Sequence, residues 1–170
     1  MVTSRWLLIP AMTRTVLALA AVLAAALPAA ATAGPAMNGT EREVIRKLND
    51  VRARHGLPRL YASRALGRAA DRHSRDMLRR DFFDHHSSDG TPFDRRVRRH
   101  ADARRVGETL AATSRRRGGA GRVVRMWMRS PPHRAIVLSR GFRRVGIARR
   151  WGSLGAAKLA VVTADFASRR

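Results

Sequence analysis

The first region of regular apolar spacing after residue 40 predicts an amphipathic helix. Val44, Leu48 and Val51 recur every three or four residues, so a helix would place their side chains on one face. Thr40 is a residue type that caps helix N-termini, and His55-Gly56 is typical of a helix end. The sequence therefore predicts a first helix over about residues 41–55.

A second amphipathic helix is predicted to begin at Ser63. Its apolar positions recur at helical spacing together with one histidine (Leu66, Ala69, Ala70, His73, Met77 and Leu78). The opposite face carries a series of arginines (Arg68, Arg72, Arg75 and Arg79). We expect the first face to pack into the protein and the arginine face to lie in solvent.

Two shorter helices are predicted in the middle of the chain. A polar loop at residues 81–90 leads to Thr91-Pro92, which opens a short helix that reaches about Arg99. Residues 120–128 form the other helix, and Ser130-Pro131-Pro132 terminates it.

Beyond Phe142 the pattern changes from helical to extended. Residues 144–149 and 158–164 have the composition of strands, and the glycine-rich segment 152–155 supplies the turn between them. Helices followed by a C-terminal β-hairpin predict an α+β domain of packed layers. We expect one core built from apolar residues of all these elements (Leu48, Val51, Leu66, Ala70, Met77, Trp127, Val145, Ile147 and Val161).

The N-terminal segment has the organisation of a secretory signal peptide. A basic start precedes the apolar residues 16–27, and Ala31-Thr32-Ala33 matches an A-x-A cleavage site. The alternative is an uncleaved membrane anchor, but the segment is alanine-rich and weakly apolar for the about 20 residues that span a bilayer. We expect cleavage near Ala33 and secretion, with a signal peptide, a flexible lead and a single domain (residues 1–33, 34–40 and 41–170).

Charge and cysteine content narrow the functional classes. The net charge is +23 and nearly all of the positive charge comes from arginine, so the protein can adhere to anionic surfaces. Aromatic residues are not interleaved with the basic clusters, which argues against specific nucleic-acid binding. Because the chain has no cysteine, it has no disulfide, thiolate metal site or cysteine nucleophile.

A lone carboxylate gives the strongest chemical signal. Of three glutamates, Glu41 and Glu43 lie together, whereas Glu108 follows a glycine in an arginine-rich region. His85 and His133 lie on either side of Glu108 in the sequence. Carboxylates and neutral imidazoles are ligands that Zn²⁺ accepts, so these three residues predict a metal site or weak acid–base chemistry.

Other histidines and motifs have simpler interpretations. His73 lies on the apolar face of the second helix, where we expect a core-edge histidine with a satisfied hydrogen bond. His86 adjoins His85, but the positions of Phe82-Phe83 and Asp89-Gly90 favour His85 for the site. The sequence contains no H-E-x-x-H, G-x-S-x-G, P-loop or dinucleotide-binding motif.

Short motifs follow one another in a characteristic order over residues 43–166 (Leu48-Asn49-Asp50-Val51-Arg52, Gly56-Leu57-Pro58, Ala70 with His73 and Met77, Phe82-Phe83-Asp84-His85, Gly107-Glu108, Trp127 to Ala135, and Thr163-Ala164-Asp165-Phe166). Together they resemble bacterial members of the CAP superfamily, the SCP-like domain of cysteine-rich secretory proteins, antigen 5 and pathogenesis-related proteins. The sequence departs from the family pattern at Thr109 and Ile136, where asparagine is usual.

The resemblance implies an α-β-α sandwich with a cleft lined by a His, Glu, Glu, His tetrad. His85, Glu108 and His133 match three of the four positions, and Ser130 stands where other members have the second acid. What remains is a two-histidine, one-carboxylate cleft that can hold Zn²⁺ or another divalent metal. Known functions in the family are diverse, so the resemblance defines the fold more closely than the function.

We therefore expect an exported, monomeric, non-catalytic binding module of the bacterial envelope or extracellular space. Its ligand would be a small molecule, a lipid or a cell-wall component. One alternative is a metal-dependent hydrolase, a peptidase or cell-wall enzyme, in which the ion activates water and Glu108 acts as base. Another is an arginine-rich adhesive to anionic polymers. The sequence leaves open whether the protein is an enzyme.

Overall fold

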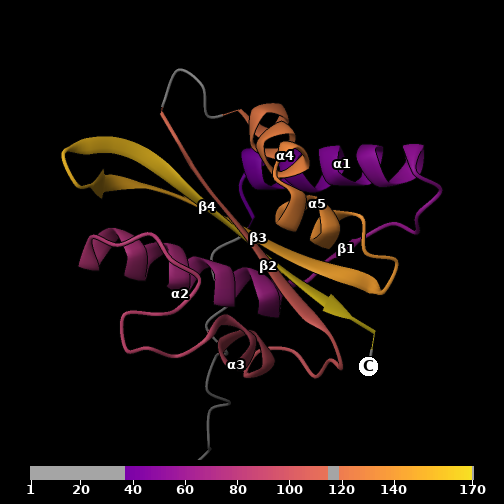
Figure 1. Ribbon diagram of the computed structural model, residues 1–170, viewed down its shortest axis with the longest axis horizontal. Coiled ribbons are helices and arrows are strands. Elements are labelled where there is room, and N and C mark those ends of the chain that lie inside the picture. The colour runs from indigo at the N-terminus through magenta and orange to yellow at the C-terminus, as the bar shows by residue number, and fades with distance from the viewer. Residues whose placement is uncertain (1–36, 115–118, 170) are drawn as a thin grey trace, which may run out of the picture. The chain divides into compact units, whose positions relative to one another are not determined.

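A four-stranded sheet forms the central layer of the domain. The computed structural model describes residues 37–114 and 119–169, and the strands lie in the order β1-β3-β4-β2 (Figure 1). β3 and β4 form an antiparallel hairpin, β2 pairs antiparallel with β4, and β1 runs parallel to β3. The strand bounds are β1 Tyr61–Ala62, β2 Val106–Thr113, β3 Phe142–Leu154 and β4 Ala157–Ser168.

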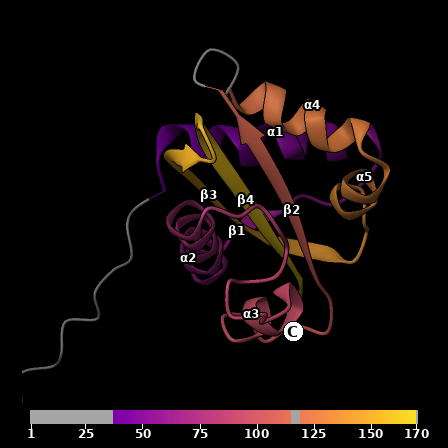
Figure 2. The same ribbon diagram turned by 60° about the vertical axis from the view of Figure 1, so that its left-hand side comes forward.

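Helices cover both faces of this sheet (Figures 1 and 2). One face carries α1 (Gly39–Arg54), α4 (Ala120–Arg129) and α5 (Pro131–Val137). The other face carries α2 (Arg64–Arg80) and α3 (Phe93–Arg98). This arrangement confirms the α+β class and the α-β-α sandwich, with helices first and a C-terminal β-hairpin.

The first helix begins earlier than the sequence predicted, and Thr40 does not cap it. Asn38 is the cap residue: its side chain accepts a hydrogen bond from the Glu41 amide at 2.9 Å, and the Glu41 carboxylate accepts one from the Asn38 amide at 2.8 Å. This reciprocal capping box satisfies two backbone donors at once, and asparagine is preferred over threonine at the cap position. The predicted cap of α2 at Ser63 is confirmed.

Three elements lie where the sequence pattern predicted none, and the first is the two-residue strand β1. β2 occupies Val106–Thr113, and α5 starts at Pro131 directly after α4 ends. Proline fits the first turn of a helix because the amide hydrogen it lacks has no partner there, so Pro131-Pro132 opens a helix as well as ending one. The hairpin turn is also shorter than predicted, because β3 extends to Leu154 and β4 begins at Ala157.

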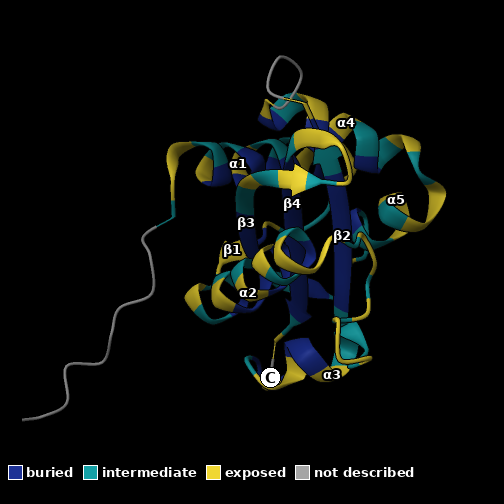
Figure 3. Cartoon of the chain, turned by 90° about the vertical axis from the view of Figure 1, so that its left-hand side faces the viewer, coloured by how far each residue is buried: buried dark blue, intermediate teal, exposed yellow. Residues whose placement is uncertain are grey.

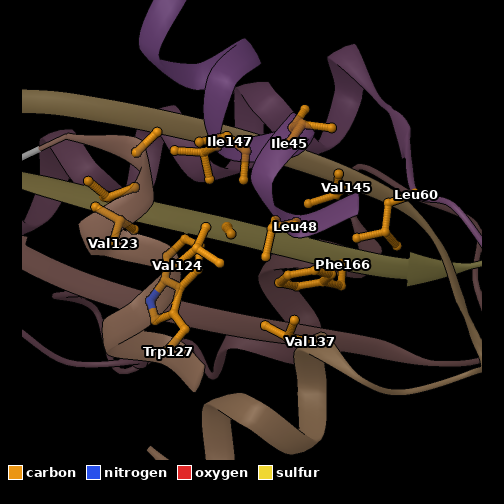
Figure 4. Packing of buried hydrophobic residues seen from close by; sticks show 14 of the residues in the cluster. Ile45, Leu48, Leu60, Val123, Val124, Trp127, Val137, Val145, Ile147 and Phe166 are labelled. Carbon is orange, nitrogen blue, oxygen red and sulfur yellow. The ribbon is translucent and has the colours of Figure 1, made fainter. Parts of the chain in front are cut away.

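Buried apolar side chains form three clusters instead of one core. The largest lies between the sheet and the layer of α1, α4 and α5, and includes Leu48, Trp127 and Phe166 (Figure 4). Leu66 belongs to a second cluster and Met77 to a third, both on the α2 side of the sheet. Every residue predicted for the core is buried, but the prediction of a single core was wrong. The buried sheet (Figure 3) separates the largest cluster from the two on the α2 side.

Within residues 37–114 and 119–169, no helix combines the length and apolar character needed to cross a membrane. The predicted signal peptide, residues 1–33, lies outside the described residues, and its cleavage stays a prediction.

Candidate functional site

Glu108 is the buried centre of the candidate site. It lies on β2 and is 1% exposed. Its two carboxylate oxygens have different partners: Oε1 is 2.8 Å from His85 Nδ1, and Oε2 accepts a hydrogen bond from Arg96 Nη2. His73 Nε2 lies 4.0 Å from the same Oε2 atom. A single carboxylate is therefore surrounded by one guanidinium group and two imidazoles.

His85 connects the buried carboxylate with the surface. Its side chain is 44% exposed, whereas that of Glu108 is fully buried. The His85 and His133 rings lie 6.2 Å apart, centroid to centroid, with an interplanar angle of 55°. Phe93 contacts His85 edge-on, with centroids 6.1 Å apart. The structure thus places His85 next to both Glu108 and His133. The loop that carries His85 is joined to β2 through the contact with Glu108.

Arg96 of α3 was missed by the sequence analysis. In addition to Glu108, its Nη1 atom donates to the His85 carbonyl and the Ser87 hydroxyl, both at 3.0 Å. One side chain thus neutralises the acid and fixes the loop that carries His85. No sequence signal marks this role, because Arg96 is one of many arginines in the chain.

His133 is positioned by a buried arginine of α1. Arg52 is 0% exposed and donates hydrogen bonds to the Val137 carbonyl at 2.7 Å and the Ser139 carbonyl at 2.9 Å. These carbonyls lie at the C-terminal end of α5, the short helix that carries His133. A cation at a helix C-terminus satisfies its free carbonyls and its negative pole, so Arg52 stabilises the helix from which His133 projects.

His73 is buried and hydrogen-bonded, as predicted. Its Nε2 atom lies 2.9 Å from the Asp84 carbonyl, while Nδ1 has no hydrogen-bond partner among the described residues. Burial lowers the pKa of His73, and this effect outweighs the attraction of the Glu108 charge. His73 is therefore a buried, uncharged imidazole beside Glu108, whereas the sequence predicted only a histidine at the edge of the core.

Asp165 supplies a second buried acid, which the sequence analysis treated only as part of a family motif. It is 0% exposed and pairs in register with Glu108 across β2 and β4. Burial and then the negative charge of Glu108 raise the pKa of Asp165 well above its usual range. The sequence signal that could have identified Asp165 is an acid inside the apolar segment Ala160–Phe166.

The two acids differ in charge. Burial raises the pKa of Glu108, but the hydrogen bond from His85 and the charge of Arg96 outweigh burial and lower it overall. Glu108 is therefore the ionised acid and Asp165 the protonated one, as expected when two carboxyl groups share one buried site. An ionised acceptor on His85 Nδ1 leaves Nε2 of the same ring for other contacts.

His86 and Ser130, the two remaining positions considered from sequence, lie apart from these contacts. His86 is exposed, and its Nδ1 atom lies 3.1 Å from Asp84 Oδ1. Ser130 ends α4 and precedes α5, and its side chain makes no capping hydrogen bond.

The metal prediction can be compared with this donor set. At the tetrahedral angle of Zn²⁺, two metal–nitrogen bonds of about 2.0–2.1 Å would place the two ring centres about 5 Å apart, whereas the His85 and His133 ring centres lie 6.2 Å apart. Both Glu108 oxygens already have partners. Over the described part of the chain, no three His, Cys, Asp or Glu side chains form a group that could hold a metal ion. The imidazoles fit a metal better than Glu108 does, and zinc binding stays a prediction.

Comparisons with known proteins agree with this fold. The model of the cysteine-rich secretory protein family, CAP, matches residues 45–162. The uncharacterized protein YkwD of Bacillus subtilis is 29% identical over 117 residues, which cover 68% of this chain and 44% of YkwD. An extracellular protein containing an SCP domain from Bacillus anthracis has 25% identity and a TM-score of 0.65 over 78% of this chain and 41% of that protein.

A further solved structure shares the fold alone. An outer surface protein from Borrelia burgdorferi superposes with a TM-score of 0.68 at 17% identity, over 80% of this chain and 97% of that protein. The present chain matches less than half of the length of YkwD and of the Bacillus anthracis protein.

Proposed function

Because the chain belongs to the cysteine-rich secretory protein (CAP) family, we propose that it is an exported CAP-domain binding module. Its ligand site is centred on the imidazoles of His85 and His133. In this proposal the protein binds its ligand without catalysing a reaction. Export is supported by the organisation of residues 1–33 and by the Bacillus anthracis relative, which is described as extracellular.

The observation that carries this proposal is the closed environment of Glu108. A general base must reach the proton that it removes, within about 2.6–3.2 Å or through one water molecule. Glu108 is buried, and His85 and Arg96 occupy its two oxygens. Asp165 is more deeply buried still, at 0% exposure, and Ser130 replaces the acid of the family tetrad. Among the described residues, neither Glu108 nor Asp165 is therefore accessible beside the imidazoles, and the exposed carboxylate of Asp84 is held by the His86 amide.

Glu108 acts in this proposal as a positioning residue. A carboxylate that accepts the Nδ1–H of a histidine fixes its tautomer and ring orientation, and presents Nε2 as a ligand. His85 and His133 would together hold a divalent metal such as Zn²⁺, which would supply an open coordination position for an anionic or carbonyl ligand. Without metal, the same two rings offer hydrogen bonds to a polar ligand.

Zinc titration of the protein purified from culture supernatant tests the proposal. We expect His85→Ala and His133→Ala each to abolish binding, Glu108→Gln to weaken it, and His86→Ala to leave it unchanged as the matched control. Hydrolysis of casein and of peptidoglycan is measured in parallel with and without a chelator. Chelator-sensitive hydrolysis that is lost in His85→Ala would overturn the non-catalytic assignment, and zinc binding that survives both histidine substitutions would overturn the assigned site.

A further inference from the structure

A second, separate cavity lies beside the candidate site, on the α2 face of the sheet. Its volume is about 320 Å³, and it is lined by residues of α2 and of the segment that leads from Ser87 through α3 to His100. His85 and His133 do not line it, whereas His73 and Arg96 do. The cavity therefore shares the side chains of His73 and Arg96 with the surroundings of Glu108, and not the two imidazoles of the proposed ligand site.

The lining of this cavity is rich in arginine. It includes four arginines (Arg72, Arg79, Arg96 and Arg99) against the acids Asp76 and Asp89. Arg96 is already paired with Glu108. Among the described residues, Arg72, Arg79 and Arg99 take part in no ion pair within 4.0 Å and no hydrogen bond from their side chains. Three exposed arginines thus line the cavity, and of these Arg99 lies near enough to Asp89 for its charge to help lower the pKa of that acid.

Both acids of the cavity are engaged by neutral groups. Asp76 accepts hydrogen bonds from the Ser88 amide at 2.9 Å and the Ser88 hydroxyl at 2.8 Å. Asp89 accepts one from the Thr91 amide at 2.9 Å. These contacts shape the loop, and both carboxylates keep their negative charge. Because Glu108 neutralises Arg96, three arginines stand against two acids, and the lining keeps a small net positive charge.

His100 lines the same cavity and lies within the field of its arginines. Burial lowers the pKa of His100, and repulsion from Arg72, Arg68 and Arg99 lowers it further. An imidazole that several cations keep neutral marks a region of positive potential, which attracts anions.

We propose that this cavity binds a phosphate group carried by a small sugar or polyol. Guanidinium groups match phosphate oxygens in two-bond geometry and form strong charge-assisted hydrogen bonds. Ser87, Ser88 and Thr91 line the same cavity. The Ser87 hydroxyl accepts from Arg96 and the Ser88 hydroxyl donates to Asp76, so each keeps one hydrogen-bonding role for a polyol. A volume of about 320 Å³ is at the small end of ordinary ligand cavities.

The composition of the lining argues against other phosphate carriers. Of the described residues that line the cavity, Ala69 alone is apolar and none is Phe, Trp or Tyr. A nucleotide base would find no ring for stacking, and an acyl chain would find no apolar wall. The inference is independent of the function proposed for His85 and His133.

Isothermal titration calorimetry with glycerol 3-phosphate in physiological salt tests this inference. The variant Arg72→Gln/Arg79→Gln/Arg99→Gln should bind at least about tenfold more weakly, a loss equal to about 1.4 kcal/mol. The matched control is Arg122→Gln/Arg125→Gln/Arg129→Gln, which removes the same charge from exposed positions of α4 and should bind normally. Melting curves establish that both variants fold, and the single Arg72→Gln variant should show a smaller loss in the same direction.

NMR titration of the histidines gives a local readout. Bound phosphate should raise the pKa of His100, because it offsets the repulsion from the arginines, and glycerol alone should not. Equal losses in both triple variants would overturn the inference in favour of general charge attraction. Binding to anionic phospholipid vesicles without binding to glycerol 3-phosphate would also overturn it, because the ligand would then be a lipid surface.

Discussion

Glu108 of β2 and Asp165 of β4 are register partners across an antiparallel pair of strands, so two buried carboxyl groups lie side by side. Only Glu108 has cationic and imidazole partners. No donor group of the described residues hydrogen-bonds to the Asp165 oxygens, and the hydrogen bond that helps to raise the pKa of Asp165 is with Glu108. Two neighbouring buried acids cannot both be ionised at low cost, and these contacts assign the negative charge to Glu108.

The first prediction concerns Asp165→Asn. The raised pKa of Asp165 means that the folded protein retains a proton which the unfolded chain, with a usual value of 3.8, releases. Its contribution to stability is full below that value and is lost as pH rises through the higher folded-state pKa. We expect the neutral asparagine to remove this loss, so that the free energy of unfolding falls less with rising pH than in the wild type.

Urea unfolding at several pH values measures this effect. Asp94→Asn, at a half-exposed position of α3, is the control and should retain the wild-type pH dependence. If Asp165→Asn also keeps the wild-type dependence, Asp165 is not the protonated acid of the pair.

The second prediction concerns the ion pair of Arg96 and Glu108. Arg96→Met leaves the buried Glu108 charge without its cation, which should lower the free energy of unfolding by about 3–5 kcal/mol. Combining Arg96→Met with Glu108→Gln removes both charges, and we expect the double variant to recover part of the loss. A double-mutant cycle by urea unfolding measures the coupling. Strict additivity would show that the two side chains do not stabilise each other.

The third prediction uses the lowered pKa of His73. The unfolded chain takes up a proton near the usual value of 6.5, while the buried ring in the folded protein resists protonation until a lower pH. The free energy of unfolding should therefore fall as pH decreases below about 6.5. His73→Gln should reduce this dependence but not remove it, because the pKa values of His100 and His133 are lowered too. His86→Gln, at an exposed position, should leave the dependence unchanged.

The amphipathic helices and the terminal hairpin were predictable because their patterns are local. α1, α2 and α4 show apolar residues at helical spacing, and β3 and β4 show apolar and β-branched runs. β2 was missed because its residues, Val106–Thr113, include glycine, glutamate and two alanines, which are poor strand formers. It forms a strand because it pairs with β4 over its whole length.

The candidate site was predictable only in part, for a related reason. Glutamate is rare in this chain, and Glu108 lies far from the other two glutamates in the sequence, so it could be identified as a candidate. Arg96 is common in type, and its role arises only when α3 packs beside β2. Asp165 becomes a partner of Glu108 through strand register, which the strand pattern alone did not specify. Residues with one distant partner therefore escaped an analysis of local patterns.

The fourth prediction concerns Trp127, which is 0% exposed and donates from Nε1 to the Leu110 carbonyl at 2.9 Å. Trp127→Ala should lower the free energy of unfolding by about 3–5 kcal/mol, because it removes a large side chain from the main cluster. Trp127→Phe keeps much of the ring and loses the hydrogen bond, so about 1–3 kcal/mol is expected. Trp151→Phe, at a position 42% exposed, is the control. An unchanged melting curve for Trp127→Ala would contradict the packing in Figure 4.

The last prediction tests the contact between α2 and β3. A Cβ atom added at Gly146 would lie 2.0 Å from the Gly67 amide nitrogen and 2.2 Å from the Leu66 carbonyl carbon. Both atoms belong to the helix backbone, so relief requires α2 to move away from the sheet. Such a displacement would open the packing around Leu66, a fully buried residue, and interiors tolerate added volume poorly. We expect Gly146→Ala to lower the free energy of unfolding by at least about 3 kcal/mol.

Gly67 provides the matched control on the opposite side of the same contact. A Cβ atom at Gly67 would meet nothing closer than the Ile147 carbonyl oxygen at 3.9 Å, which is an ordinary contact distance. Alanine is also favoured over glycine inside a helix by about 0.8–1.0 kcal/mol, so Gly67→Ala should be neutral or stabilising in chemical denaturation. The same substitution at two facing glycines should therefore act in opposite directions. Similar losses at both positions would mean that close approach of α2 to β3 is not what requires glycine at residue 146.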